Sequence, residues 1–189
     1  MATPVRTSLN FSTLWDNYPD DPPCVDADGN KIYDDQCAIK LGTALAKSGV
    51  SFDKFPGPRC MANPPKNNGM ALRAEELATW LKSRPFKDCP AVRILTTGKD
   101  FQTALHGQTG IIFFKDYWYR KNAGKDETSP TGDHIDLWRR DRLTPSFETF
   151  LRFTLGIGHV RNLLHPLSPH NNIYSNLEDA KQVWFWAIS

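Results

Sequence analysis

The chain has 189 residues, of which 40% are hydrophobic and 12% aromatic, and this is enough for a single domain, residues 1–189, with a hydrophobic core. The formal net charge of +2 and the lack of long runs of like charge argue against a nucleic-acid partner. The longest apolar stretches, such as 183–188, are far shorter than the roughly 20 residues of a membrane-spanning helix. We therefore expect no membrane insertion.

The N-terminal region reads as an irregular lead-in. Residues 1–12 lack a charged segment followed by an apolar one, so we expect no signal peptide and synthesis in the cytoplasm. Residues 1–33 are rich in Pro, Asp and Asn, with one aromatic anchor at 11–15. The segment DADGN is expected to form a turn and not a calcium loop, because the sixth position is Lys31 and the twelfth is Cys37.

Two amphipathic helices follow. Residues 36–48 carry one stripe at helical spacing, formed by Cys37, Leu41, Ala44, Leu45 and Ser48. Asp34 or Asp35 can cap this helix, and Gly49 can end it. After a loop over 50–70, a second helix is predicted at 71–83, closed by Pro85, with its inward face formed by Leu72, Leu77, Trp80 and Leu81.

Short strands dominate the rest of the chain. Candidates are 91–95, 109–118, 133–138 and 182–189, and 142–144 is a possible return strand of a hairpin that turns through 139–141. A further helix is expected at 147–156. Helices followed by a mostly antiparallel sheet indicate an α+β fold.

Cys37 is a candidate nucleophile. In the first turn of a helix, its sulfur would lie near free N–H groups and the positive end of the helix dipole, which favour the thiolate. Asp34 and Asp35 oppose this effect unless they point away. The alternative is that Cys37 only packs, since it shares the apolar stripe and free cysteines are often buried.

His134 is a candidate general base. Along DHIDLW, the side chains of His134, Asp136 and Trp138 project from one face of a strand, and a histidine there can take a thiol proton. Asp136 is the favoured group to orient the imidazole, while Asp141 and residues near Thr144–Ser146, which a tight hairpin would bring opposite His134, remain open. A purely structural histidine is the alternative.

The other ionisable candidates are weaker. We expect surface positions for the remaining histidines, although two of them could line a groove (His159 and His165); the others are His106 and His170. No cysteine pair has CxxC spacing and no histidine stands at zinc-finger distance, so we expect no structural zinc site.

Four segments together resemble the type VI secretion amidase effectors of family 4, in the same order and over nearly the whole chain. They are QCAIKLGTAL, TGIIFFKDYW, GDHIDLW and VWFW. The resemblance implies a papain-like NlpC/P60 fold with Cys37 as nucleophile and His134 as base. Eleven residues after His134 the family pattern has an aspartate, but this chain has Pro145. The third catalytic group therefore stays open between Asp136 and Asp141.

The resemblance also implies an antibacterial function. Such effectors are injected by the type VI secretion machinery into the periplasm of rival Gram-negative cells, where they hydrolyse the D-glutamyl–meso-diaminopimelate amide of peptidoglycan stem peptides. A cognate immunity protein protects the producer, and no cofactor is required. The Cys37 N–H would hold the oxyanion, and Lys40, Arg73 and Arg93 are available for the carboxylates of the substrate.

In the oxidising periplasm the remaining cysteines could form a bridge. A Cys60–Cys89 disulfide is one expectation, with Cys24 as an alternative partner. Two other functional classes remain: a different cell-wall amidase or deamidase of the same broad fold, and a non-enzymatic binding domain in which Cys37 and His134 are structural.

Overall fold

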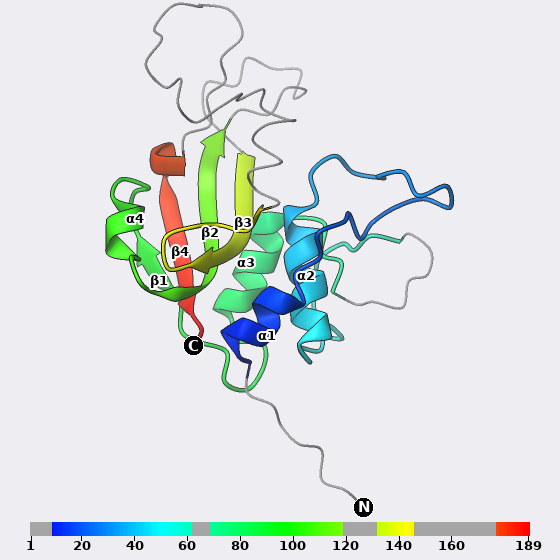
Figure 1. The fold of residues 1–189 in the computed structure, drawn as a ribbon, viewed down its shortest axis with the longest axis horizontal. Coiled ribbons are helices and arrows are strands. Elements are labelled where there is room, and N and C mark those ends of the chain that lie inside the picture. Colours follow the sequence, from blue (N-terminus) through cyan, green and yellow to red (C-terminus); the bar gives the residue numbers. More distant parts are fainter. Residues whose placement is uncertain (1–8, 62–68, 119–131, 146–176) are drawn as a thin grey trace, which may run out of the picture.

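The computed structural model describes residues 9–61, 69–118, 132–145 and 177–189. A four-stranded antiparallel sheet has the strand order β1-β4-β2-β3, with helices packed against it (Figure 1). The elements in chain order are α1 Phe11–Asp16, α2 Cys37–Lys47, α3 Ala74–Lys82, β1 Arg93–Leu95, α4 Phe101–Ala104, β2 Thr109–Trp118, β3 Gly132–Arg139, the short 3-10 helix η2 Leu177–Asp179 and β4 Gln182–Ala187. This arrangement confirms the predicted α+β class.

The sheet is covered on both faces, which explains the continuous apolar run in β2. Ile111 and Phe113 lie in a hydrophobic cluster with side chains of α1, α2 and α3. Ile112 and Phe114 lie in a second cluster on the opposite face, with α4 and β4 residues. Strand β3 is an edge of the sheet, and Figure 1 shows α2 and α3 on the side of this edge.

Helix α2 agrees with its prediction. Leu41, Ala44 and Leu45 of the predicted stripe are fully buried. The helix ends at Lys47, and two residues later the chain turns away at Gly49, which adopts φ +93°, a conformation that favours glycine. The Gly49 N–H donates to the Ala46 carbonyl and the Val50 N–H to the Leu45 carbonyl, both at 3.0 Å, which satisfies the last carbonyls of the helix.

Other elements agree in kind and differ at their boundaries. Helix α3 begins at Ala74 and not at 71, so Leu72 lies half-buried before the helix, while Leu77, Trp80 and Leu81 are buried as predicted. The four strand segments predicted at 91–95, 109–118, 133–138 and 182–189 are all present. The DADGN segment forms the expected turn, in which Asp26 accepts from the Asn30 N–H. The helix predicted at 147–156 lies outside the described residues.

Two local predictions are wrong. The lead-in contains helix α1, because the Asn10 side chain caps it by accepting from the Ser12 N–H at 2.9 Å. The proposed return strand at 142–144 is reduced to a single bridge between Arg139 and Arg142. The turn itself forms as expected. No helix among the described residues is long and apolar enough to cross a membrane.

The predicted Cys60–Cys89 bridge is also wrong, because the disulfide joins Cys24 to Cys60. Cys24 and Cys60 share a small buried cluster with Ile39 of α2. Cys89 lies against the end of α3, where its thiol donates to the Leu81 carbonyl at 3.6 Å. Burial raises the pKa of Cys89 to about 11, so it remains a neutral packed thiol.

Candidate active site

The candidate site forms where the start of α2 meets the edge strand β3. Cys37 is the first residue of α2, half-buried and free of any disulfide. The backbone N–H of Ile135 in β3 donates a hydrogen bond to the Cys37 sulfur. Because β3 is the last strand of the sheet, its outward N–H groups have no strand partner and can serve a side chain.

His134 and Asp136 flank Ile135 on β3 and are almost completely buried. The alternation is as predicted: Ile135 packs with the helices, and Trp138, two residues beyond Asp136, packs on the other face. The His134 Nε2 and the Asp136 Oδ2 are 3.6 Å apart. The strand therefore brings an imidazole and a carboxylate to the residue that contacts the Cys37 sulfur.

Asp136 is fixed by hydrogen bonds from two sides. Its Oδ1 accepts from the Leu137 N–H at 2.8 Å and from the Thr144 hydroxyl at 2.8 Å. Its Oδ2 accepts from the Thr144 N–H at 3.3 Å. Thr144 is brought back to β3 by the turn at 139–142, where the Arg139 N–H donates to the Arg142 carbonyl. Hydrogen bonds to a buried carboxylate hold its orientation strongly.

The Cys37 thiol is neutral in the resting structure. Burial raises the pKa of Cys37 well above its ordinary value, the nearby Asp35 carboxylate raises it further, and Asp136 adds a smaller effect in the same direction. The hydrogen bond from the Ile135 N–H lowers this pKa but does not reverse the shift. The expected stabilisation of a thiolate by the helix N-terminus is therefore outweighed, and a base is needed to activate the thiol.

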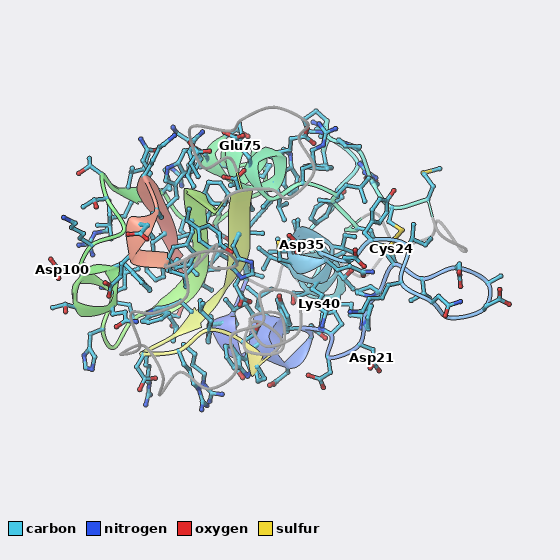
Figure 2. All side chains as sticks on the ribbon, turned by 90° about the horizontal axis from the view of Figure 1, so that it is seen from above. Asp21, Cys24, Asp35, Lys40, Glu75 and Asp100 are labelled. Carbon is cyan, nitrogen blue, oxygen red and sulfur yellow. A yellow bond between two sulfur atoms is a disulfide. The ribbon has the colours of Figure 1, made fainter. Side chains whose placement is uncertain are left out.

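Asp35 is the acid that interacts with the start of α2, and Asp34 is exposed. The Asp35 Oδ1 accepts from the Cys37 N–H at 3.3 Å. Figure 2 shows Asp35 at the N-terminal end of α2, with Cys24 to one side. In the resting structure the Cys37 N–H, expected to hold an oxyanion, thus faces a carboxylate.

The other sequence candidates lie elsewhere. Asp141 is exposed in the turn after β3, where its N–H donates to the Arg139 carbonyl. His106 is exposed, as predicted. Ser146, His159, His165 and His170 lie outside the described residues. The structure therefore brings Asp136, and not Asp141, to His134.

Of the three cations considered for substrate binding, only Lys40 is near the site. It lies one helical turn after Cys37. Burial lowers the pKa of Lys40, and the charges of Asp20 and, to a smaller extent, Asp136 oppose this shift. Its Nζ donates to the Asp20 carbonyl at 2.5 Å. Arg73 is exposed and paired with Glu76, and Arg93 lies on β1 at the opposite edge of the sheet.

Two residues at the site, Gln36 and Tyr117, were missed by the sequence reasoning, whereas Thr144 belongs to the stretch that a tight hairpin was expected to bring opposite His134. Thr144 holds Asp136, Gln36 contacts Cys24, and Tyr117 is buried with a hydroxyl that has no hydrogen-bond partner among the described residues. Tyr117 lies where the register of β2 with β3 shifts between Phe114 and Trp118, which no residue pattern indicated. Within the described part of the chain, no group of three His, Cys, Asp or Glu side chains is arranged to hold a metal ion.

Comparisons with solved structures support the fold. The effector of a Tae4/Tai4 effector–immunity system from Salmonella typhimurium is 14% identical, with a TM-score of 0.60 and coverage of 97% of this chain and 100% of that one. The effector of a Tae4–Tai4 complex from Enterobacter cloacae is also 14% identical, with a TM-score of 0.53 and the same coverage. This similarity confirms the predicted papain-like, NlpC/P60-like fold.

No curated protein matches the sequence. A family model does match, over residues 33–186, which include Cys37, His134 and Asp136. Its description is type VI secretion system (T6SS), amidase effector protein 4, or Tae4. The match spans most of the chain and confirms the predicted resemblance. The chain therefore belongs to the Tae4 family of type VI secretion amidase effectors.

Proposed function

We propose that this amidase effector hydrolyses the D-glutamyl–meso-diaminopimelate bond of peptidoglycan stem peptides, acting as a single domain, residues 1–189. Cys37 is the nucleophile, His134 the general base and Asp136 the group that orients His134. The observation that carries the proposal is the contact of the Cys37 sulfur with the Ile135 N–H, between His134 and Asp136 on β3.

The first half of the reaction forms an acyl-enzyme. Because the resting thiol is neutral, His134 takes the proton from Cys37 as the sulfur attacks the γ-carbonyl carbon of D-glutamate. The carbonyl π electrons move to oxygen and give a tetrahedral oxyanion. The imidazolium of His134 then protonates the amine of diaminopimelate, the carbon–nitrogen bond breaks, and a thioester to Cys37 remains.

The second half releases the acyl group. His134 removes a proton from a water molecule that attacks the thioester carbon, and the carbon–sulfur bond breaks as Cys37 regains its proton. Asp136 stabilises the imidazolium that forms in both halves, since its carboxylate lies 3.6 Å from Nε2. No step requires a group that the chain does not supply.

The oxyanion requires a change at the start of α2. A Cys37 N–H that donates to Asp35 at rest would donate to the oxyanion in the tetrahedral intermediate, with the Asp35 carboxylate turned away. Lys40 is the cation placed to attract a substrate carboxylate, because it follows Cys37 by one turn and is only half-buried. Figure 2 labels Lys40 and Asp35, which both lie in the region of α2.

We also propose that the effector acts in the periplasm of Gram-negative target cells after delivery by the type VI machinery. A cognate immunity protein would inhibit it. The family match and the structural similarity to effectors solved with Tai4 immunity proteins support this part of the proposal.

The residue roles are tested with a soluble stem peptide that contains the D-glutamyl–meso-diaminopimelate bond. Cys37→Ala and His134→Gln should abolish hydrolysis at concentrations where the wild type cleaves, and Asp136→Asn should lower kcat by about a hundredfold with little change in KM. Asp141→Asn is the matched control, because Asp141 is exposed in the turn. If Asp141→Asn lost as much activity as Asp136→Asn, the assignment of Asp136 would be wrong.

A further inference from the structure

The side chain of Gln36, which directly precedes Cys37, is hydrogen-bonded to the backbone of Cys24. Its Oε1 accepts from the Cys24 N–H at 3.0 Å, and its Nε2 donates to the Cys24 carbonyl at 2.8 Å and to the Tyr33 carbonyl at 3.1 Å. The side chain is 6% exposed. The Gln36 carbonyl also accepts the N–H of Lys40 at 2.8 Å, in the first turn of α2. Gln36 thus joins the start of the helix to a loop residue twelve positions earlier.

Cys24 is held in turn by its disulfide to Cys60. Cys60 belongs to a separate segment, where its N–H donates to the Met70 carbonyl at 2.9 Å. The loop around Cys24 is otherwise largely exposed between residues 26 and 34. Among the described residues, the disulfide is the covalent cross-link between this loop and the segment of Cys60. Figure 2 shows Cys24 and its disulfide beside the N-terminal end of α2.

We infer that Gln36 is a positioning residue for Cys37, and that it acts only while the Cys24–Cys60 disulfide is formed, so that hydrolysis depends on an oxidising environment. The inference rests on the proposed function, in which Cys37 is the nucleophile. A glutamine whose amide oxygen and amide nitrogen both bind the backbone of one residue transmits the position of that residue, because neither end of the amide is left to rotate.

The redox step is a thiol–disulfide exchange. One thiolate of a dithiol reductant attacks the Cys24–Cys60 bond and forms a mixed disulfide, which the second thiol of the reductant then resolves. The reductant is oxidised to a disulfide, Cys24 and Cys60 become thiols, and Cys37 is unchanged. Once the bond is broken, the Cys24 loop is free to move and Gln36 loses a fixed partner. A displacement of the nucleophile by about 1 Å is enough to cost on the order of a hundredfold in rate.

The test compares the oxidised protein with protein treated with dithiothreitol, using the stem-peptide substrate. We expect reduction to lower kcat by roughly tenfold to a hundredfold with KM nearly unchanged. A cysteine hydrolase without such a disulfide shows the opposite response, because a reductant protects its nucleophile. Oxidised Gln36→Leu should lose a similar factor, and reduction should then cost little more, since the two changes break the same connection.

Gln108→Leu is the matched control. Gln108 is half-buried and its Nε2 also donates to a backbone carbonyl, that of Ala104 at 3.1 Å, but it lies before β2. This variant should keep wild-type kcat and the full response to reduction. Thermal melts of every protein show whether it is folded at the assay temperature; if the reduced protein is not, oxidised Gln36→Leu decides the matter.

A measurement without substrate separates this inference from the proposed function. In a Cys89→Ala background, the rate of alkylation at Cys37 is followed against pH, with the labelled residue identified by mass spectrometry. Reduction and Gln36→Leu should each shift this profile, and Gln108→Leu should not. An unchanged profile and an unchanged kcat after complete reduction would overturn the inference. Failure of the wild type to cleave the peptide in either state would instead overturn the proposed function.

Discussion

Gly42 of α2 lies where the helix approaches the backbone of Gly69 most closely. A Cβ at Gly42 would lie 1.6 Å from the Gly69 carbonyl oxygen and 2.8 Å from its carbonyl carbon. Both are main-chain atoms and cannot rotate away. To reach the 3.0 Å that real Cβ atoms keep, the two segments would have to separate by about 1.4 Å. Gly42→Ala therefore forces apart the Gly69 backbone and the helix that begins with Cys37.

The sign of the stability change distinguishes this clash from helix propensity. Alanine in place of glycine stabilises a helix interior by about 1 kcal/mol, while overpacking against a rigid neighbour costs about 3 kcal/mol. We expect Gly42→Ala to lower the free energy of unfolding by about 2 kcal/mol in urea titrations, and to lower kcat by roughly a hundredfold because Cys37 is displaced. The difference in the free energy of unfolding between Lys47→Ala and Lys47→Gly measures the helix propensity of alanine over glycine without a clash, because Lys47 is exposed at the end of the same helix. A Gly42→Ala variant as stable as the wild type would refute the reasoning.

Three further variants test the contacts at the site. Tyr117→Phe removes a buried hydroxyl that has no partner among the described residues, so urea unfolding should show a gain of about 1 kcal/mol, and a clear loss would contradict this structure. Thr144→Val removes the hydroxyl that binds Asp136 and should cost about 2 kcal/mol and lower kcat; unchanged values would show that the contact is dispensable. Asp35→Asn removes a charge that raises the pKa of Cys37, so the alkylation profile of the thiol should shift to lower pH, and an unshifted profile would rule out that electrostatic effect. Because the pKa of folded Cys37 is raised, the thiol loses its proton in the unfolded chain before it does so in the folded protein as pH rises above the unfolded pKa of about 8.5. Deprotonation then favours the unfolded chain, so the free energy of unfolding should fall as pH rises beyond that value.

Features with a local cause were predictable from the sequence. The spacing of apolar residues in α2 and the glycine that ends it act within a few residues, and so does the alternation that places His134 and Asp136 on one side of β3. These patterns report the periods of the helix and the strand directly. Cys37 and His134 could be proposed for the same reason.

Features that depend on tertiary proximity were not predictable. The pairing of Cys24 with Cys60 follows from two loops that meet beside α2, and sequence separation favoured Cys89 equally well. Thr144 reaches Asp136 because the turn at 139–142 continues as a single bridge and not as a strand. The direction of the Cys37 pKa shift required the burial of the thiol and the position of Asp35, since the helix terminus alone suggested the opposite sign.

Digestion of purified Gram-negative sacculi tests the central claim most directly. Wild type and Cys37→Ala are incubated side by side under oxidising conditions, and the released fragments are identified by mass spectrometry. We expect new fragments that end at D-glutamate with the wild type, and none with Cys37→Ala. Fragments cut at another bond would contradict the proposed substrate, and equal cleavage by both proteins would contradict Cys37 as the nucleophile.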